Sequence, residues 1–530
     1  MATEKHFTQI LIKANGQPLP EPLMDALGEV VVDSSLYQPN MFSIVVRDPK
    51  IKWVDDQDYL APGKEIEIKV QTGAEQGNLK GLLMCGEITS LEPSFSAQGR
   101  TTLLVRGYDK SHRLHRGKQT RTFANLSIAQ IIKTIAEEAD LIPELDATTV
   151  RYDYLLQNNQ TNMEFLLALA ERVGFQVYAA EGTLFFKKST WSQGNGPEFE
   201  LGETLSGFQP RLSTIRQTDR VTVKGWDAKS KNRIMGQASP NSDLNQGGLE
   251  ETGGATAKKI FRSTAESVLV NQPVFSAAEA EALAARLSDD LSREFIQAEG
   301  ICRGDPRVKA GWFITLKGLG QRFSGHYFVT SATHTYSAAG YETRFTITGR
   351  HPQTLRYLLR ARDDRLSAQP RLHGVVTGLV TNLNDKFDLG RVKVKYNWLG
   401  DIESDWVRIA SPMAGPDRGF FYLPEINDEV LVAFEHGDMH RPYIIGVLWN
   451  SQDKPPKSNT DVVGGGKVNQ RLVKSRSGHQ ILLDDSSGGE KIEIIDRSGQ
   501  KVVIDSQAQS IELSGGGRKV TMRNGQVHIT

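Results

Sequence analysis

The stretch that decides the fold is Ser477–Thr530, SGHQILLDDSSGGEKIEIIDRSGQKVVIDSQAQSIELSGGGRKVTMRNGQVHIT. Within it, pairs of apolar residues separated by one position recur at intervals of roughly seven to eleven residues, and glycine marks most of the turns between them. Successive side chains of a β-strand point to opposite faces, so each pair predicts a short strand with two inward apolar side chains. The twelve predicted core residues are Ile481, Leu483, Ile492, Ile494, Val502, Ile504, Ile511, Leu513, Val520, Met522, Val527 and Ile529.

Strands this short cannot bury an apolar face alone. Stacked as rungs and wound with identical copies from other chains, they would form a rigid prism whose free sheet edges lie only at its ends. We therefore predict a triple-stranded β-helix needle over residues 472–530, a column on the order of 30 Å at the usual strand spacing. A needle with no domain after it suggests a mechanical rather than a catalytic role.

Composition narrows the class of protein. The 530 residues predict about three to five domains, and 63 basic against 63 acidic residues argue against a dedicated nucleic-acid binder. The two cysteines, Cys85 and Cys302, are far apart, as expected of buried thiols in a protein made in a reducing cytoplasm. The N-terminus lacks a signal-peptide pattern, and no apolar run approaches the ~18 residues of a membrane span.

Upstream of the needle the pattern indicates a mainly β, multidomain chain. Alternating runs such as Lys64–Val70 predict strands, capping boxes at Ser127 and Thr161 predict two helices, and a third helix is expected over Ala277–Gln297. The polar segment Ser239–Ala257 reads as a loop. The predicted divisions are a β region (1–115), an α/β region (116–204), a second β region with one long helix (205–355), a linker (356–371), a compact β unit (372–450), a linker (451–471) and the needle (472–530).

A family resemblance is carried by residues 390–450. This segment contains GRVKVKYNWLGD and WVRIASPMAGPDRGFFYLPEINDEVLVAFEHGDMHRPYIIGVLWN, and it resembles the OB-fold domain of VgrG spikes and of related hub-spike proteins of contractile phage tails. The run TNMEFLLALAERVGFQVYAAEGTLFF within 160–186 resembles the hub of the same family, and GWFITL at 311–316 resembles its later barrel.

The resemblance implies that 1–115 and 205–355 are two hub β-barrels, that 116–204 is an α/β hub insertion, and that 372–450 is an OB-fold domain. It further implies a homotrimeric central spike with no enzymatic activity and no cofactor. Three hubs of two similar barrels each would match a six-fold inner tube, held by baseplate proteins, to a three-fold needle that briefly contacts a target membrane. It also implies a PAAR-repeat tip protein against His528, Ile529 and Thr530, and it allows effector cargo. Three settings stay open: type VI secretion, a contractile phage tail, and an extracellular phage-tail-like particle assembled from protein made in the bacterial cytoplasm. The modest length resembles the third.

Several patterns could carry other chemistry. Glu435–His440 places two histidines four residues apart, but its glycine and flanking strands indicate a turn rather than a zinc helix. A basic and aromatic surface that could bind nucleic acid would consist of Lys393, Lys395, Tyr396 and Trp398. A contact with a neighbouring subunit is the preferred interpretation of these residues. At the tip, Gln526-Val-His528 holds half of the H-x-H iron motif of some phage spikes, and strand alternation points His528 outward, so we expect no metal there.

Two functions from other classes are kept as alternatives. A tail-associated glycan hydrolase would need two carboxylates in a cleft, for which Asp401, Glu403 and Asp405 are candidates, but these read as a solvated turn. A glycan-binding tail protein would need exposed aromatic residues on the needle, and residues 472–530 contain no Phe, Trp or Tyr. Only about twenty residues separate the OB domain from the needle, too few for an inserted lysozyme domain.

Overall fold

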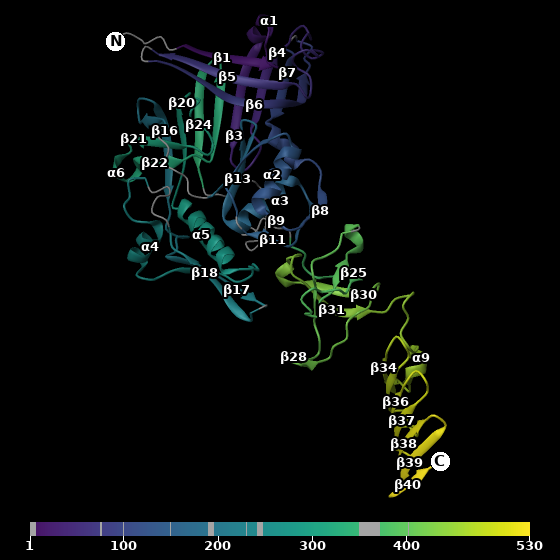
Figure 1. Ribbon diagram of the computed structural model, residues 1–530. Helices are drawn as coiled ribbons and strands as arrows, with labels where there is room; N and C mark the ends of the chain where they lie inside the picture. The colour runs from purple at the N-terminus through teal and green to yellow at the C-terminus, as the bar shows by residue number, and fades with distance from the viewer. Residues whose placement is uncertain are drawn as a thin grey trace. The chain divides into compact units, whose positions relative to one another are not determined.

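An eleven-stranded sheet joins the start of the chain to strands far along it. The computed structural model describes residues 7–74, 77–98, 100–148, 150–188, 196–228, 230–240, 247–348, 371–400 and 402–530. The sheet has the order β16-β20-β24-β23-β3-β4-β7-β6-β5-β1-β2, and Figure 1 shows its two groups of strands together. Its strands are β1 (Phe7–Ala14), β2 (Gln17–Pro18), β3 (Leu27–Ser35), β4 (Met41–Arg47), β5 (Glu65–Ala74), β6 (Gly77–Ser94), β7 (Thr102–Tyr108), β16 (Leu205–Leu212), β20 (Ile296–Arg303), β23 (Ser331–Ser337) and β24 (Gly340–Ile347).

The two groups meet where β3 pairs antiparallel with β23, with Val32 opposite His334 and Val30 opposite Tyr336. Alternating apolar residues of the first group, among them Val30, Phe42 and Ile44, form a buried core. The two predicted hub barrels therefore share one continuous sheet, which local sequence patterns do not predict. The short helix α1 (Glu21–Asp25) lies between β2 and β3.

An α/β segment follows β7 through the 3-10 helix η1 (Lys110–His115). The predicted capping boxes are confirmed: Ser127 with Gln130 begins α2 (Ile128–Glu138), and Thr161 with Glu164 begins α3 (Asn162–Val173). Figure 1 shows the two helices close together, and their apolar faces share one core with β13 and β14. The strands here are β8 (Gln119–Phe123), β9 (Leu126–Ser127), β10 (Ile142–Leu145), β11 (Arg151–Tyr152), β12 (Leu155–Gln160), β13 (Phe175–Ala180) and β14 (Thr183–Lys188).

The third predicted helix is shorter than expected. It is α5 (Ala277–Arg293), and its face containing Leu283 and Leu287 covers a sheet of order β18-β17-β19. Phe295 lies beyond the helix, because the alternating residues from Ile296 onward continue as β20 of the large sheet. The remaining elements of this region are β15 (Glu198–Glu200), β17 (Arg220–Asp227), β18 (Asn232–Ala238), α4 (Gly253–Phe261), β19 (Glu266–Leu269), β21 (Phe313–Lys317), α6 (Gly320–Phe323) and β22 (Gly325–Phe328).

Two predicted loops contain regular structure. The start of α4 falls inside the loop expected at Ser239–Ala257, because Thr252 caps it by accepting a hydrogen bond from the Ala255 N–H. The linker expected over 451–471 includes α9 (Asn459–Val462) and a hairpin of β32 (Val463–Gly464) with β33 (Lys467–Val468). Residues 356–370 of the other predicted linker lie outside the described residues.

The region predicted as an OB fold forms a five-stranded sheet of order β26-β25-β30-β31-β27. The predicted alternation is confirmed, since Val392, Val394, Tyr396, Val430, Val432 and Phe434 are all buried. The elements are β25 (Val375–Asn382), β26 (Lys393–Lys395), η2 (Asn397–Leu399), β27 (Arg408–Ile409), β28 (Ala414–Gly415), β29 (Arg418–Gly419), β30 (Glu429–Phe434), η3 (Glu435–Gly437) and β31 (Pro442–Leu448).

The chain divides into two compact units, which are described separately below. The first spans 1–376, 384–410 and 432–444, and the second spans 377–383, 411–431 and 445–530. The boundary thus passes through the OB region. Among the described residues, the helices are too short or too polar to cross a membrane.

Candidate subunit interface

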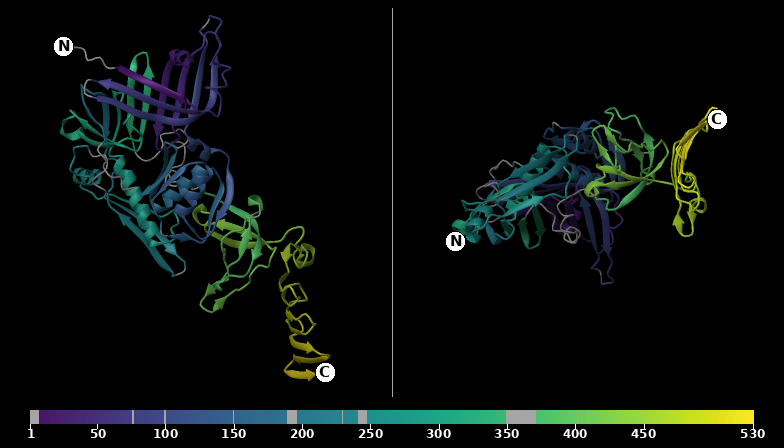
Figure 2. Two further views of the ribbon diagram at one scale, coloured as in Figure 1. Left: turned by 45° about the horizontal axis from the view of Figure 1, so that its top comes forward. Right: turned by 90° about the horizontal axis from the view of Figure 1, so that it is seen from below.

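The end of the second unit is a seven-stranded antiparallel sheet, here called the ladder, whose strands pair in chain order. In Figure 2 they follow one another toward the C-terminus. Short glycine-containing turns join most strands, as at Gly499, whose φ of 88° favours glycine. The ladder strands are β34 (Gln470–Lys474), β35 (Gln480–Asp484), β36 (Lys491–Ile495), β37 (Lys501–Asp505), β38 (Ser510–Gly515), β39 (Arg518–Arg523) and β40 (Gln526–Ile529).

Pairing register places the twelve predicted core residues in two columns on one face of the ladder. For example, Ile492 lies opposite Leu483 on one side and opposite Ile504 on the other. Because directly opposed side chains of neighbouring strands are in contact distance, each column is a continuous row of aliphatic groups. The first column is Ile481, Ile494, Val502, Leu513, Val520 and Ile529. The second is Leu483, Ile492, Ile504, Ile511, Met522 and Val527.

Within the described chain, this apolar face is largely uncovered. Ten of the twelve residues are exposed, from 41% at Ile511 and Leu513 to 75% at Ile529. Only Val502 and Val520 are half-buried. A contiguous aliphatic face of this length is a feature of surfaces that pack against another molecule.

The opposite face of the ladder, here called the polar face, carries most of the charged side chains but also holds the apolar residues Leu482, Ile495 and Val503. Lys491 pairs with Glu493 at 3.2 Å, and Lys519 pairs with Glu512 at 2.5 Å. Gln470 Nε2 donates to Asp484 Oδ2 at 2.7 Å, and hydrogen bonds from Ser486 help to hold the pKa of Asp484 below its usual value. The ladder therefore has one continuous apolar face, and its ion pairs and polar hydrogen bonds lie on the other.

The residues predicted to contact a tip protein end this ladder. His528 lies opposite Thr521 and, by strand alternation, on the face away from Val527 and Ile529. The backbone of Thr530 exchanges hydrogen bonds of 2.8 and 2.9 Å with Lys519. Among the described residues β40 has a ladder neighbour on one side only, so its outer edge is open to pairing.

In the first unit, the turn after β30 is held against β12 by His440. The Leu156 N–H donates to His440 Nε2 at 3.0 Å, and His440 Nδ1 lies 2.9 Å from Asp438 Oδ1. Because a backbone N–H can only donate, Nε2 must accept, which assigns the proton to Nδ1. The two histidines of the predicted turn therefore do different things: His440 makes this contact, whereas His436 is exposed.

The buried Arg172 and the half-buried Arg441 complete the contact, which we call the clasp (Arg172, Asp438, His440 and Arg441). Arg172 lies 3.9 Å from Asp438, and Arg441 Nη2 donates to the Val274 carbonyl at 2.5 Å. Burial disfavours the charged form of Asp438, but the neighbouring His440 and Arg172 outweigh it, and its pKa lies below the usual value. The clasp thus ties α3 and the segment between β19 and α5 to the turn between β30 and β31.

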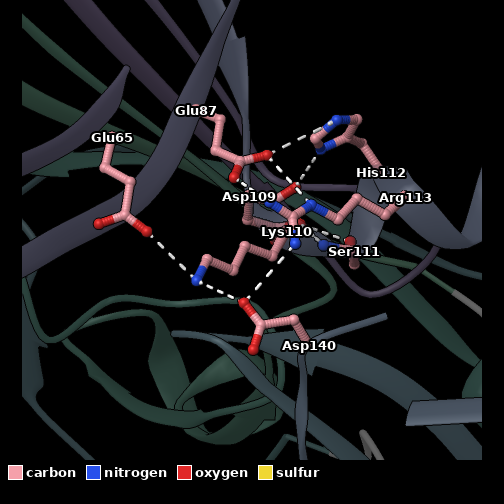
Figure 3. A network of polar contacts seen from close by, with 8 residues as sticks. All are labelled: Glu65, Glu87, Asp109, Lys110, Ser111, His112, Arg113 and Asp140. Carbon is pink, nitrogen blue, oxygen red and sulfur yellow. Dashed lines mark hydrogen bonds and ion pairs between the residues drawn. The ribbon is translucent and has the colours of Figure 1, made fainter. Parts of the chain in front are cut away.

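The basic residues Lys110, His112 and Arg113 of η1, which follows β7, take part in ion pairs within the chain, as Figure 3 shows. Arg113 pairs with Glu87 of β6, and its Nη1 lies 3.6 Å from Asp140 Oδ2. Lys110 Nζ lies 3.1 Å from the same carboxylate oxygen, and the pKa of Lys110 is raised by its hydrogen bonds to Asp140 and Glu65. These residues join the large sheet to the α/β segment.

The remaining candidate side chains make contacts within the chain. Tyr396 is buried and cannot stack on nucleic acid, while Lys393 pairs with Glu403 at 3.4 Å. Of the acidic turn, Asp401 lies outside the described residues, and Asp405 accepts from the neighbouring Trp406 N–H. Within the described part of the chain, groups of three or more His, Cys, Asp or Glu that could hold a metal do not occur.

Comparisons with known proteins agree with this architecture. Residues 4–338 match the model of the Alg8 N-terminal domain family, and residues 376–449 match the type VI secretion system/phage-baseplate injector OB domain. Among curated relatives, the type VI secretion system spike protein VgrG1a of Pseudomonas aeruginosa is 23% identical over 434 residues, covering 74% of this chain and 64% of VgrG1a. VgrG5 of the same organism is 33% identical over 135 residues, or 22% of this chain and 17% of VgrG5.

Solved structures show the same fold. A chain of the half-lidded Francisella PdpA–VgrG complex has a TM-score of 0.54 at 9% identity, over 99% of this chain and 88% of that one. The lidded form gives 0.54 at 9% identity, over 96% and 80%. The chain spans less than two thirds of the curated relatives just named. With a family model that matches more than half of its length, and with spike relatives and a baseplate OB domain, the chain belongs to the Alg8 N-terminal domain family and is a VgrG-family spike protein.

Proposed function

We propose that three copies of this chain join through the apolar face of the ladder and form the needle of a contractile injection apparatus. The observation that carries the proposal is the pair of aliphatic columns, ten of whose twelve residues are exposed in a single chain. Three ladders, each turning one such face toward a common axis, would enclose a dry core and leave their polar faces in water.

The rest of the chain would connect this needle to the apparatus. Three hubs with two barrel-like halves each would offer six similar surfaces to a six-fold inner tube and to baseplate proteins. Within the first unit, the clasp holds the turn between β30 and β31 against α3 and β12 by polar contacts, which supports a rigid hub. In this role the chain transmits force and catalyses no reaction.

Three further parts of the proposal concern the partners and the setting. The open edge of β40, with Ile529 and Thr530, would receive a tip protein of the PAAR-repeat type. Effector cargo would travel with the spike. The spike, tube and baseplate would assemble into a tail-like particle that is released from the cell. To test this setting, culture supernatant is sedimented and the pellet is probed with antibody against the chain, which should be found in the particle fraction.

The test of trimerisation is sedimentation equilibrium of the purified full chain. The expected mass is three times the 58.7 kDa of one chain. Limited proteolysis on the same sample should leave residues 472–530 uncut, since an intertwined needle unfolds slowly. A monomer whose C-terminal segment is cleaved rapidly would refute the proposal.

A further inference from the structure

A second uncovered apolar surface lies in the second unit, on the excursion between β27 and β30. We call Met413–Ile426 the aromatic strap. It is a hairpin in which Ala414 pairs with Gly419 and the Phe420 N–H donates to the Met413 carbonyl at 3.0 Å. A side chain in place of Gly419 would meet that carbonyl at 2.5 Å, so this hairpin needs glycine there.

The strap exposes three consecutive aromatic residues. Phe420, Phe421 and Tyr422 are 51%, 76% and 65% exposed, and the first and third stack with ring centroids 6.3 Å apart. Further exposed apolar residues of the strap are Met413, Leu423 and Ile426. Aromatic residues and methionine are enriched in the buried centre of protein interfaces, whereas surfaces that stay in water rarely gather them.

The strap is connected to the base of the ladder. Glu425 Oε1 lies 3.0 Å from Arg476 Nε, which belongs to the turn between the first two ladder strands. Glu425 is near the end of the strap, and Arg476 precedes the first column residue, Ile481, by five positions, so the end of the strap lies beside the start of the ladder. A neighbouring copy that covers the first rungs of one ladder would therefore lie close to the strap of the same chain.

We propose that the aromatic strap packs against a neighbouring copy of this chain at the base of the needle, an inference that rests on the proposed trimer. In a three-fold ring each strap would contact the next copy, so that the contacts close after three subunits. Burial of three aromatic rings per chain would then stabilise the contact between subunits at the base of the needle, beside the first strands of the ladders. A second copy is favoured over other occupants because it is the molecule expected on the adjoining ladder face.

Photo-crosslinking of the full chain tests this contact. A benzophenone amino acid replaces Phe421 in one variant and Phe387 in the control, whose side chain is similarly exposed (76% and 70%) but lies outside the strap. Light- and heavy-isotope chains are co-expressed, and sedimentation first establishes whether each variant is a trimer. We expect the Phe421 variant to give several-fold more light–heavy crosslinked species after denaturation than the Phe387 variant.

The outcomes separate the two proposals. A monomer before irradiation would refute the trimer itself. A trimer in which Phe421 and Phe387 give equal yields would refute the strap contact and leave the needle standing. The same irradiation is repeated with vesicles of phosphatidylethanolamine and phosphatidylglycerol; transfer of the Phe421 crosslink from protein to lipid would overturn the assignment of a second copy as the occupant.

Discussion

Replacing Ile504 by aspartate should dissociate the trimer. Ile504 is in the middle of the second column, between Ile492 and Ile511, and 43% of it remains exposed in one chain. Full burial of an aliphatic side chain contributes about 1.5–3 kcal/mol, so covering the remaining part contributes about 0.6–1.3 kcal/mol per chain. The ten exposed residues of the face together correspond to about five whole side chains, or about 7–15 kcal/mol per chain before the cost of association.

The aspartate removes its share of that burial and adds a carboxylate to a dry core. Desolvation of a buried ion costs several kcal/mol, and the three copies repeat it, so the trimer should lose on the order of 10 kcal/mol. At about 1.4 kcal/mol per factor of ten, the association constant falls by about seven orders of magnitude. If the face instead remained in contact with water, the same substitution would change the free energy of unfolding little, because most surface substitutions alter stability by about 0.5 kcal/mol or less.

Ile495→Asp is the matched control. Ile495 belongs to the neighbouring strand β36 but alternates onto the polar face, where Lys501 lies opposite. Sedimentation equilibrium at micromolar concentration should find Ile504→Asp monomeric and Ile495→Asp trimeric. If Ile504→Asp remains a trimer as stable as the control, the apolar columns do not face the needle axis and the argument fails.

Three further outcomes are expected. Asp438→Asn should destabilise the first unit by about 3–5 kcal/mol at pH 7, because His440 and its neighbours keep the carboxyl ionised. The pKa of Asp438 is lowered by folding, so this contribution is present above the unfolded value near 4 and is lost as pH falls further; urea unfolding of both proteins between pH 7 and 3 should show the difference shrinking, and a constant difference would contradict the linkage. Glu87→Ala should cost about 1–3 kcal/mol by leaving Arg113 without its main partner, measured as a shift of the urea midpoint; an unchanged midpoint would show that the pair is not needed. Dialysis against a chelator should leave the melting temperature unchanged, because His528 alternates away from Val527 and Ile529; a drop that zinc or iron restores would place a metal at the tip.

Local patterns in the sequence predicted much of the fold. The capping boxes at Ser127 and Thr161 identified two helix starts, and alternation along Val392–Tyr396 identified a barrel strand, because both signals depend only on neighbouring residues. The pairs of apolar residues at the C-terminus likewise marked the six strands β35 to β40. The spacing of apolar residues predicts a strand or helix well where one face of that element packs against a core.

Long-range contacts could not be predicted in this way. Pairing of β3 with β23 joins residues about three hundred positions apart, and nothing local marks β23 as its partner. The end of α5 was missed because the apolar period of the helix continues into Phe295, which is buried in the core of the large sheet instead. The clasp depends on Arg172 meeting Asp438, two residues that are 266 positions apart (438 minus 172).

The candidate interface was predicted in part. Alternation showed which ladder residues share a face, but the two columns need the cross-strand register, which turn geometry fixes. The aromatic strap was visible in the sequence as Phe420-Phe421-Tyr422, yet three adjacent aromatic residues could equally have been core. Only their exposure in the folded chain distinguishes a docking surface from an interior one.

The pairing of β3 with β23 also sets an order of events during synthesis. After β4 has formed beside it, β3 keeps one bare edge until Ser331–Ser337 leaves the ribosome. At a translation rate of about 5–20 residues per second, the interval between β3 and β23 lasts roughly 15–60 s. During this time the free edge of β3 can pair with strands of other nascent chains on the same polysome. The ladder is translated only after β23 and β24. Its apolar face is therefore synthesised when all strands of the large sheet of the same chain are already available for pairing. In the proposed trimer, the ladders of different chains would therefore associate only after the large sheet of each chain has been synthesised.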